Sequence, residues 1–190
     1  TWTKWIDSNA ACNNFEGHVY IAGSKIHVAY VSDYDAGQGR RNEVYYRRFN
    51  MSLGMEHLSC PSGQLDGVAA NYPCIEATSA SFVNVYYQYG SASLHPIWES
   101  YTTDSGVNWN PSEKISVGSP GVDLSCPEVG VWVDNGDRRK MIVAGANNSG
   151  TYRCFVVRSE TNPGYCIMVW CGSCYCRSRA FNLRLSPNVC

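Results

Sequence analysis

The feature that most constrains the fold of this chain is a strand-like sequence pattern that recurs at a nearly fixed interval. Segments rich in Val, Ile and Tyr begin at residues 25, 81 and 140, which are 56 and 59 residues apart. A second set begins at residues 42, 96 and 151, which are 54 and 55 residues apart. Each unit opens with a related phrase, at 11–17, 72–77 and 125–130, and is followed by a short strand such as Glu56–Ser59 or Glu113–Ser116. This period predicts an array of similar supersecondary units.

The hydrophobic pattern within the units is typical of strands. Apolar residues alternate with polar ones or form short runs, bounded by clusters of Gly, Asn, Asp, Ser and Pro, and no capped helical pattern of ten or more residues is present. We predict strands at His18–Ala22, Ile26–Val31, Glu43–Phe49, Phe82–Tyr89, Ile97–Thr102, Gly130–Val133, Met141–Ala144 and Tyr152–Val157. Four short antiparallel strands per unit are the pattern of a propeller blade, so we expect an all-β, small propeller-like single domain over residues 1–190.

The two ends of the chain suggest how such an array closes. Residues 1–9 look like the last strand of a unit, and 166–186 look like a compressed final unit, which predicts about four blades. The N-terminal strand would then pair with the last unit or with a neighbouring subunit, and pairing with a neighbour generates open filaments.

One stretch carries a sharper motif, Thr-Thr-Asp-Ser-Gly-Val-Asn-Trp, beginning at residue 102. It resembles the Asp-box, Ser/Thr-x-Asp-x-Gly-x-Thr-Trp, of the sialidase-like BNR-repeat propellers, and departs from it at Asn108, where Thr is usual. The residues that match are Thr102, Asp104, Gly106 and Trp109. A short acceptor at Asp104 can bond nearby backbone N–H groups, Gly106 permits positive φ, and Trp109 can pack back on the next strand. The resemblance implies a structural turn between third and fourth strands, away from the substrate pocket.

The same resemblance implies a sialidase site with three arginines, a Tyr–Glu nucleophile pair and an acidic acid/base residue. An early Arg-Ile-Pro strand, also implied, is absent, and most arginines fall in pairs on expected loops or outer strands. Asp33, Asp35 and Glu43 could form an acid/base group, although a charged connecting loop explains them as well. Four units of about 47 residues fit the chain, whereas six do not. We therefore assign no catalytic residue and keep a sialidase-type glycoside hydrolase as the alternative.

Cysteine usage indicates an oxidising compartment, because ten cysteines in 190 residues are unusual in a reducing cytosol. We expect disulfide staples rather than a zinc site, although Cys171 and Cys174 form a CxxC pair, and we predict a bridge between Cys60 and Cys74. Two sequons, at Asn50 and Asn147, agree with secretion. The cysteines expected to pair are Cys12, Cys60, Cys74, Cys126, Cys154, Cys166, Cys171, Cys174, Cys176 and Cys190.

Charge and loop composition limit the choice of partner. Fifteen basic and sixteen acidic residues give the chain no net positive charge that would attract nucleic acid. The sequence also contains no apolar run of membrane-spanning length. Loops that join second to third strands, and one unit to the next, gather on one face of a propeller, and here they offer aromatic and planar polar groups suited to sugars. The residues proposed to bind there are Tyr34, Asp35, Arg40, Arg41, His95 and Asn147. We expect an extracellular, non-catalytic module that binds glycan or copies of itself and needs no cofactor or metal.

Overall fold

A computed structural model describes residues 14–33, 42–63, 69–90, 95–115, 123–134, 137–148, 151–159 and 166–169. All regular structure in these ranges is β-strand, arranged as three four-stranded antiparallel sheets. In each sheet the strands follow one another in chain order, so each sheet is an up-and-down meander. None of the described segments is an apolar helix that could cross a membrane.

The first sheet consists of β1 (Asn14–Ala22), β2 (Lys25–Ser32), β3 (Glu43–Asn50) and β4 (Met55–Ser59). The second consists of β5 (Ala70–Ala77), β6 (Val83–Tyr89), β7 (Ile97–Thr102) and β8 (Glu113–Lys114). The third consists of β9 (Asp123–Asp134), β10 (Asp137–Asn148), β11 (Thr151–Ser159) and β12 (Cys166–Val169). The predicted all-β class and the four strands per unit are confirmed.

The predicted fourth, compressed unit is wrong where the structure describes it. Cys166–Val169 pairs with β11 and is the outer strand of the third sheet, so it completes that unit instead of opening another. The sequence analysis identified no fourth strand for the third unit, and β12 is that strand. The expected N-terminal strand and residues 170–186 of the expected last unit lie outside the described residues.

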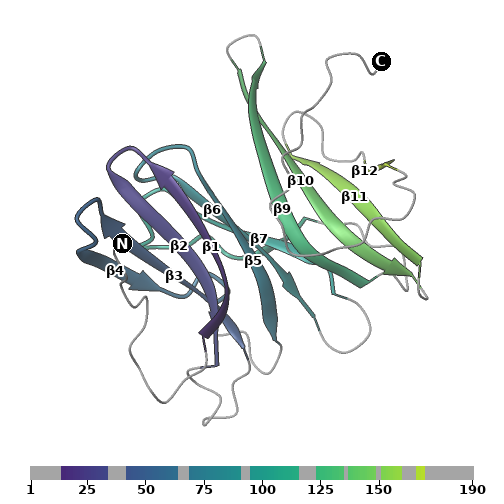
Figure 1. Cartoon of the computed structure of the whole chain (residues 1–190), viewed down its shortest axis with the longest axis horizontal. Coiled ribbons are helices and arrows are strands. Elements are labelled where there is room, and N and C mark those ends of the chain that lie inside the picture. Colours follow the sequence, from purple (N-terminus) through teal and green to yellow (C-terminus); the bar gives the residue numbers. More distant parts are fainter. Residues whose placement is uncertain are drawn as a thin grey trace.

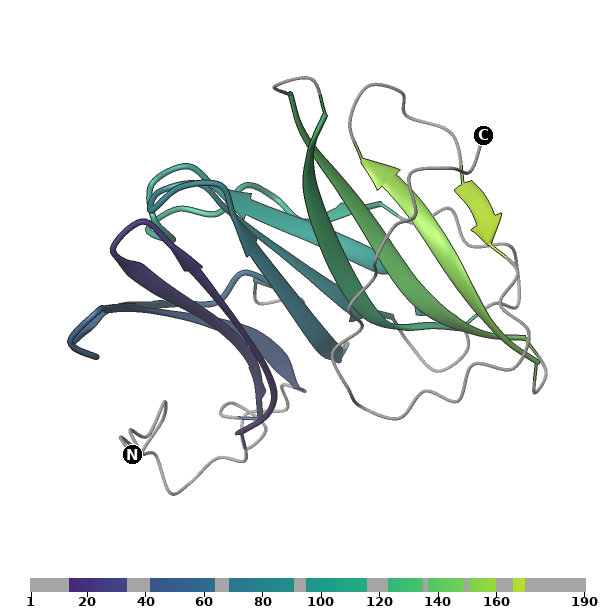
Figure 2. The ribbon, with the colours of Figure 1, turned by 45° about the horizontal axis from the view of Figure 1, so that its top comes forward.

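The sheets lie side by side in chain order, as Figures 1 and 2 show, with β5 against β1 and β2 and with β9 against β5 and β6. The first strand of each sheet thus lies next to the first strand of the neighbouring sheet. A buried core fills the space between the first and second sheets, with Val31, Tyr46, Ile75 and Val85 at its centre. A smaller core, which includes Tyr86 and Ile142, lies between the second and third sheets.

Each of the three inner strands, β1, β5 and β9, carries a β-bulge at the equivalent place near its start. The bulges lie between Phe15 and His18, between Asn71 and Cys74, and between Ser125 and Glu128, with two residues opposite one on the partner strand. The second and third bulges contain Pro73 and Pro127, which suit such positions because proline cannot donate to the strand ladder. The repeat seen in the sequence is therefore a repeat of local backbone geometry.

The predicted bridge between Cys60 and Cys74 is wrong, because both side chains are free thiols. Cys60 follows β4, and its Sγ donates to Glu43 Oε2 at 3.2 Å; burial raises the pKa of this thiol to about 12. Cys74 lies on β5, the inner strand of the next sheet. The other eight cysteines either lie outside the described residues or have side chains that the structure does not describe, so their pairing stays a prediction.

Candidate functional site

One region that concentrates polar side chains is the turn between β7 and β8, which carries the motif that resembles an Asp-box. Thr102 Oγ1 donates to Asp104 Oδ1 at 2.7 Å and accepts the Gly106 N–H at 3.0 Å. Asp104 Oδ1 also accepts the Asn108 N–H at 2.8 Å, while Asn108 Nδ2 donates to Asp104 Oδ2 at 2.7 Å. These hydrogen bonds to Asn108 and Thr102 lower the pKa of Asp104 to about 2. The Asp104 carboxylate therefore stabilises the turn through these hydrogen bonds.

The same turn also contacts the first sheet. His57 Nε2 lies 2.8 Å from the Gly106 carbonyl, and Trp109 Nε1 donates to Ser59 Oγ at 2.9 Å. Gly106 has φ of 90°, and a Cβ added there would lie 2.3 Å from Tyr46 Cε1. Trp109 packs edge-on against the Tyr46 ring, with centroids 5.2 Å apart. The turn therefore fastens the second sheet to the first, which is a structural role.

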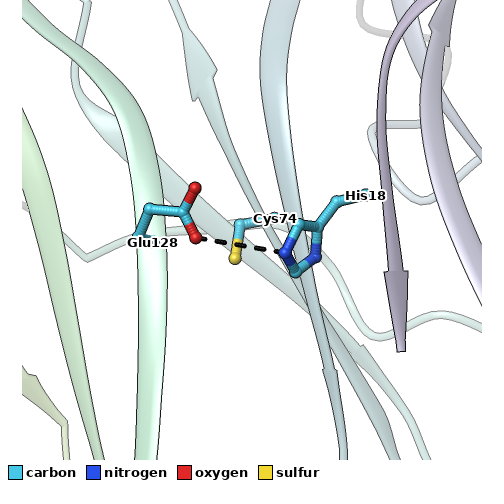
Figure 3. A group of neighbouring side chains, drawn as sticks. All are labelled: His18, Cys74 and Glu128. Carbon is cyan, nitrogen blue, oxygen red and sulfur yellow. Dashed lines mark ion pairs between the residues drawn. The ribbon is translucent and has the colours of Figure 1, made fainter. Parts of the chain in front are cut away.

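The second region is an axial cluster, defined as His18, Cys74 and Glu128 together with the bulge residues Glu16 and Tyr72. His18, Cys74 and Glu128 are 56 and 54 residues apart, and each directly follows the bulge of its own inner strand. Figure 3 shows the three side chains pointing toward one another from three different sheets. One histidine ring nitrogen, the cysteine sulfur and one carboxylate oxygen all lie within 4.8 Å of one another. Equivalent positions in the repeat thus converge on one place.

Within the cluster, the imidazole of His18 contacts residues of β5 in the second sheet and of β9 in the third sheet. The Ile75 N–H donates to His18 Nδ1 at 3.1 Å, and His18 Nε2 lies 3.9 Å from Glu128 Oε2. Because Nδ1 accepts a hydrogen bond, the neutral ring carries its proton on Nε2 and presents it toward Glu128. The side chains of His18 and Glu128 remain 34% and 58% exposed, so solvent or a ligand can reach them.

The bulge residues of the first two inner strands add a strained, exposed rim. Glu16 and Tyr72 both have φ of 52°, an uncommon backbone conformation for residues other than glycine. Glu16 Oε2 accepts the Tyr72 N–H at 2.8 Å, so the two bulges are in direct contact. Strain at exposed residues that converge on one place is a feature of functional sites. Tyr72 is 37% exposed, which leaves part of its ring open to a ligand.

Cys74 is not an activated nucleophile in this arrangement. Its side chain is buried, and this burial, followed by the negative charge of Glu128, raises the pKa of the thiol far above its usual range. Hydrogen bonding from the backbone of Val129 and Ile75 acts in the opposite direction without cancelling the shift. The thiolate that nucleophilic catalysis needs is therefore scarce near neutral pH.

A tyrosine–glutamate pair of the kind implied by the sialidase resemblance is present, but in the wrong environment. Tyr86 on β6 lies opposite Glu99 on β7 in the strand pairing and is fully buried between the second and third sheets. Burial raises the pKa of the phenol well above its usual range, followed by the effect of the Glu99 charge. Tyr86 therefore belongs to the core and is closed to substrate, while Glu99 opposite it is half-buried.

The residues proposed from sequence to bind a ligand are mostly outside the described ranges. Tyr34, Asp35, Arg40 and Arg41 lie outside them, and the side chain of Asn147, on β10, is not described. His95 lies just before β7 and is half-buried. Their role stays a prediction.

The axial residues themselves were missed by the sequence analysis. His18, Cys74 and Glu128 differ in chemical type and match no motif, so they stand out only when the opening phrases of the units are aligned. That alignment places each at the same step after Glu-Gly, Tyr-Pro or Cys-Pro. The repeat was thus the one signal that could have found them.

Comparison with solved structures finds similar structures at low sequence identity. An endo-arabinase from Bacteroides thetaiotaomicron VPI-5482 is 16% identical with a TM-score of 0.51, over 80% of this chain and 57% of that chain. The K499G mutant of NanB sialidase from Streptococcus pneumoniae is 14% identical with a TM-score of 0.47, over 73% of this chain and 20% of that chain. The chain thus spans only part of the length of either protein. The likeness to the endo-arabinase, a propeller glycoside hydrolase, shows a propeller-type fold.

No protein-family profile matches the sequence, and no curated protein matches it. Membership of an Asp-box repeat family therefore stays a prediction, as does the number of blades.

Proposed function

We propose that this chain is an extracellular, non-catalytic carbohydrate-binding module whose ligand site is the axial cluster. The observation that carries the proposal is the convergence of three equivalent bulges, which bring Tyr72, Glu16, His18 and Glu128 together with their side chains at least partly exposed. The ten cysteines and two sequons support the extracellular location. The fold shared with an endo-arabinase supports carbohydrate as the class of ligand.

The chemistry of the cluster suits a sugar. The partly exposed ring of Tyr72 offers a flat apolar surface for the C–H face of a pyranose or furanose ring. Glu16, which lies against Tyr72, and Glu128 offer carboxylate oxygens that accept hydrogen bonds from sugar hydroxyls. A neutral ligand also fits a chain whose formal net charge is only -1.

The binding test is a calorimetric titration of the full chain with arabino-oligosaccharides and sialyllactose, one at a time. Replacing Tyr72 by Ala should weaken binding at least about tenfold, since a tenfold change corresponds to about 1.4 kcal/mol. Met51→Ala is the matched control, because Met51 is a 57% exposed side chain on the turn between β3 and β4. Equal affinity in the Tyr72→Ala and Met51→Ala proteins would contradict the proposed site.

A glycoside hydrolase of sialidase type remains the alternative function, because two carboxylates, Glu16 and Glu128, belong to one cluster. Fluorogenic sialoside and arabinofuranoside substrates separate the two functions. The binding module should hydrolyse neither. Turnover that disappears in Glu128→Gln or in Arg41→Ala would make the chain an enzyme.

Self-association is a second candidate, favoured by the outer face of the first sheet. On the second sheet, Ile75 and Ala77 are 0% and 3% exposed because the first sheet covers them. The equivalent residues of the first sheet are Val19 and Ile21, at 56% and 58% exposed. Met55 and Leu58 on β4, which are also exposed, extend the outer face. No sheet within the described ranges covers these side chains.

Since a sheet of this same chain covers the equivalent face of the second sheet, the occupant we propose for the outer face is a second copy of the chain. Head-to-tail use of such a face builds an open filament. Analytical ultracentrifugation should show concentration-dependent association that Ile21→Asp abolishes. Val107→Asp, at a 57% exposed position on the turn after β7, is the control and should associate normally. A wild-type chain that stays monomeric at high concentration would contradict this proposal.

A further inference from the structure

The three facing side chains of the axial cluster form a ligand set that a sugar does not explain. His18 offers an imidazole nitrogen, Cys74 a sulfur and Glu128 a carboxylate oxygen, each from a different sheet (Figure 3). A sugar would contact the exposed His18 and Glu128 but has no use for a buried thiol beneath them. Nitrogen, sulfur and oxygen in one place are the donors that zinc-class cations take in proteins.

The distances are close to those of a coordinated ion. Donors bound to one tetrahedral zinc lie roughly 3.3–3.7 Å from one another, given bond lengths of about 2.0–2.3 Å. His18 Nε2 and Glu128 Oε2 are already 3.9 Å apart, and all three donor atoms lie within 4.8 Å. An inward movement of about 1 Å or less would bring them onto one ion. Glu128 lies at the exposed side, so it provides the way in.

The surroundings of Cys74 also favour its thiolate once an ion is present. Hydrogen bonding from the backbone at Val129 and Ile75 reaches its side chain and stabilises negative charge on the sulfur. Such outer contacts orient a metal ligand and tune it. In the absence of an ion, burial keeps the proton on sulfur. The missing component is therefore a positive charge at the position that Glu128 and His18 face.

We propose that His18, Cys74 and Glu128 bind one zinc-class divalent cation on the axis where the three inner strands meet. The ion ties the three sheets together and keeps a fourth coordination position open on the Glu128 side, for water or for a ligand hydroxyl. Binding forms one bond each to sulfur, nitrogen and oxygen and releases the thiol proton to solvent. The ring proton of His18 moves from Nε2 to Nδ1, so the Ile75 N–H loses Nδ1 as an acceptor and keeps its contact with the Cys74 sulfur.

This inference does not depend on carbohydrate binding, since zinc or cobalt alone is the probe.

The experiment is a titration of the chelator-treated full chain with Co²⁺, and then with Zn²⁺ to displace it. Absorption by thiolate-to-cobalt charge transfer reports on the Cys74 bond directly. The wild type and Cys60→Ser should both show the band, and Cys74→Ser should lose it together with one equivalent of bound zinc. Cys60→Ser is the matched control, because Cys60 is also a free thiol, is half-buried and lies beside Glu43, away from the axial cluster.

Glu128→Gln is the second variant and keeps the test decisive if Cys74→Ser fails to fold, since Glu128 is largely exposed. It should bind zinc at least about tenfold more weakly than the wild type, because a neutral amide oxygen is a poorer ligand for the cation than a carboxylate oxygen. Zinc should also raise the melting temperature of the wild type and of Cys60→Ser, and should not raise that of Cys74→Ser. Equal zinc stoichiometry in Cys74→Ser and Cys60→Ser, or unchanged affinity in Glu128→Gln, would overturn the proposal.

Discussion

The Asp-box-like turn after β7 and the axial cluster both gather polar side chains between neighbouring sheets, but they use them in opposite ways. In the turn, Thr102, Asp104 and Asn108 bond one another or nearby backbone, and the turn itself is bonded to the first sheet. In the axial cluster, His18 and Glu128 face each other at 3.9 Å with much of their side chains exposed. In the turn, the polar side chains bond one another and the nearby backbone, whereas in the axial cluster the exposed side chains leave room for a ligand.

The backbone is unusual in both regions. At the turn, positive φ falls on Ser105 and Gly106, and at the bulges it falls on Glu16 and Tyr72. The two regions differ in exposure, because Glu16 and Tyr72 are exposed and lie beside the axial side chains. The difference teaches that the best-defined motif in this sequence maintains the architecture, while the candidate ligand site has no motif at all.

The largest expected effect comes from adding a methyl group to the turn. Gly106→Ala should destabilise the protein by about 2–4 kcal/mol, because the new Cβ clashes with the Tyr46 ring and alanine disfavours φ of 90°. Chemical denaturation measures the loss. Gly63→Ala is the control, since Gly63 has similar φ but nothing within 4 Å of the added Cβ, and it should cost clearly less. Equal losses in the two variants would break the assignment of the turn as a fastening between sheets.

A smaller loss should follow removal of the Thr102 hydroxyl. Thr102→Ala leaves the buried N–H of Gly106 without its acceptor, which should cost about 1–3 kcal/mol. Thr102→Ser keeps the hydroxyl and should recover most of that loss. Oligosaccharide affinity should not change in either variant, and a marked change would show that the two regions are not separate.

Acid should weaken the turn in a way that depends on Asp104. Its pKa is about 2 in the folded chain against an ordinary value of 3.8, so the unfolded chain binds the proton more readily. The stability contributed by this carboxylate is therefore complete above about pH 4 and is lost as pH falls toward 2. Urea midpoints across this window should fall less steeply for Asp104→Asn than for the wild type. Parallel curves for the two proteins would contradict the hydrogen-bonded role of the carboxylate.

The smallest change in stability is expected at the axial rim. Tyr72→Gly relieves the strain of φ at 52° but frees the unfolded backbone, so stability should stay within about 1 kcal/mol of the wild type. Binding of carbohydrate should nevertheless be lost, because the exposed ring is removed. Thermal unfolding and calorimetry on the same sample would separate the two effects, and a large destabilisation with normal binding would reverse the comparison.

Much of the fold could be predicted because its signals are local. Alternating β-branched and aromatic residues mark the strands, and Ile97–Thr102 is observed with the predicted bounds. The extent of β10 was underestimated, because residues 137–140 and 147–148 at its two ends are polar and carry no hydrophobic alternation. The structural roles of Gly106 and Asp104 could be predicted, because a tight turn needs a residue that tolerates positive φ and a short side chain that accepts backbone hydrogen bonds.

The axial cluster could not be predicted in the same way, since His18, Cys74 and Glu128 meet only after three sheets have packed. Nothing in the sequence near Cys74 indicates that its sulfur will face a histidine from another sheet. The error over Cys60 has the same origin: its distance from Cys74 along the chain is short, but the two thiols belong to different sheets. Proximity in sequence is a poor guide where each unit packs against the next.

The measurement that tests the central contrast most directly is a residue-resolved NMR titration of the ¹⁵N-labelled chain with arabino-oligosaccharides and sialyllactose. Ligand binding at the axis should shift the amide signals of Tyr72, Ile75 and Val129 and leave those of Ser105 and Gly106 unchanged. Shifts that centre on the turn after β7, or no saturable shift with either sugar, would contradict the assignment of the axial cluster as the ligand site.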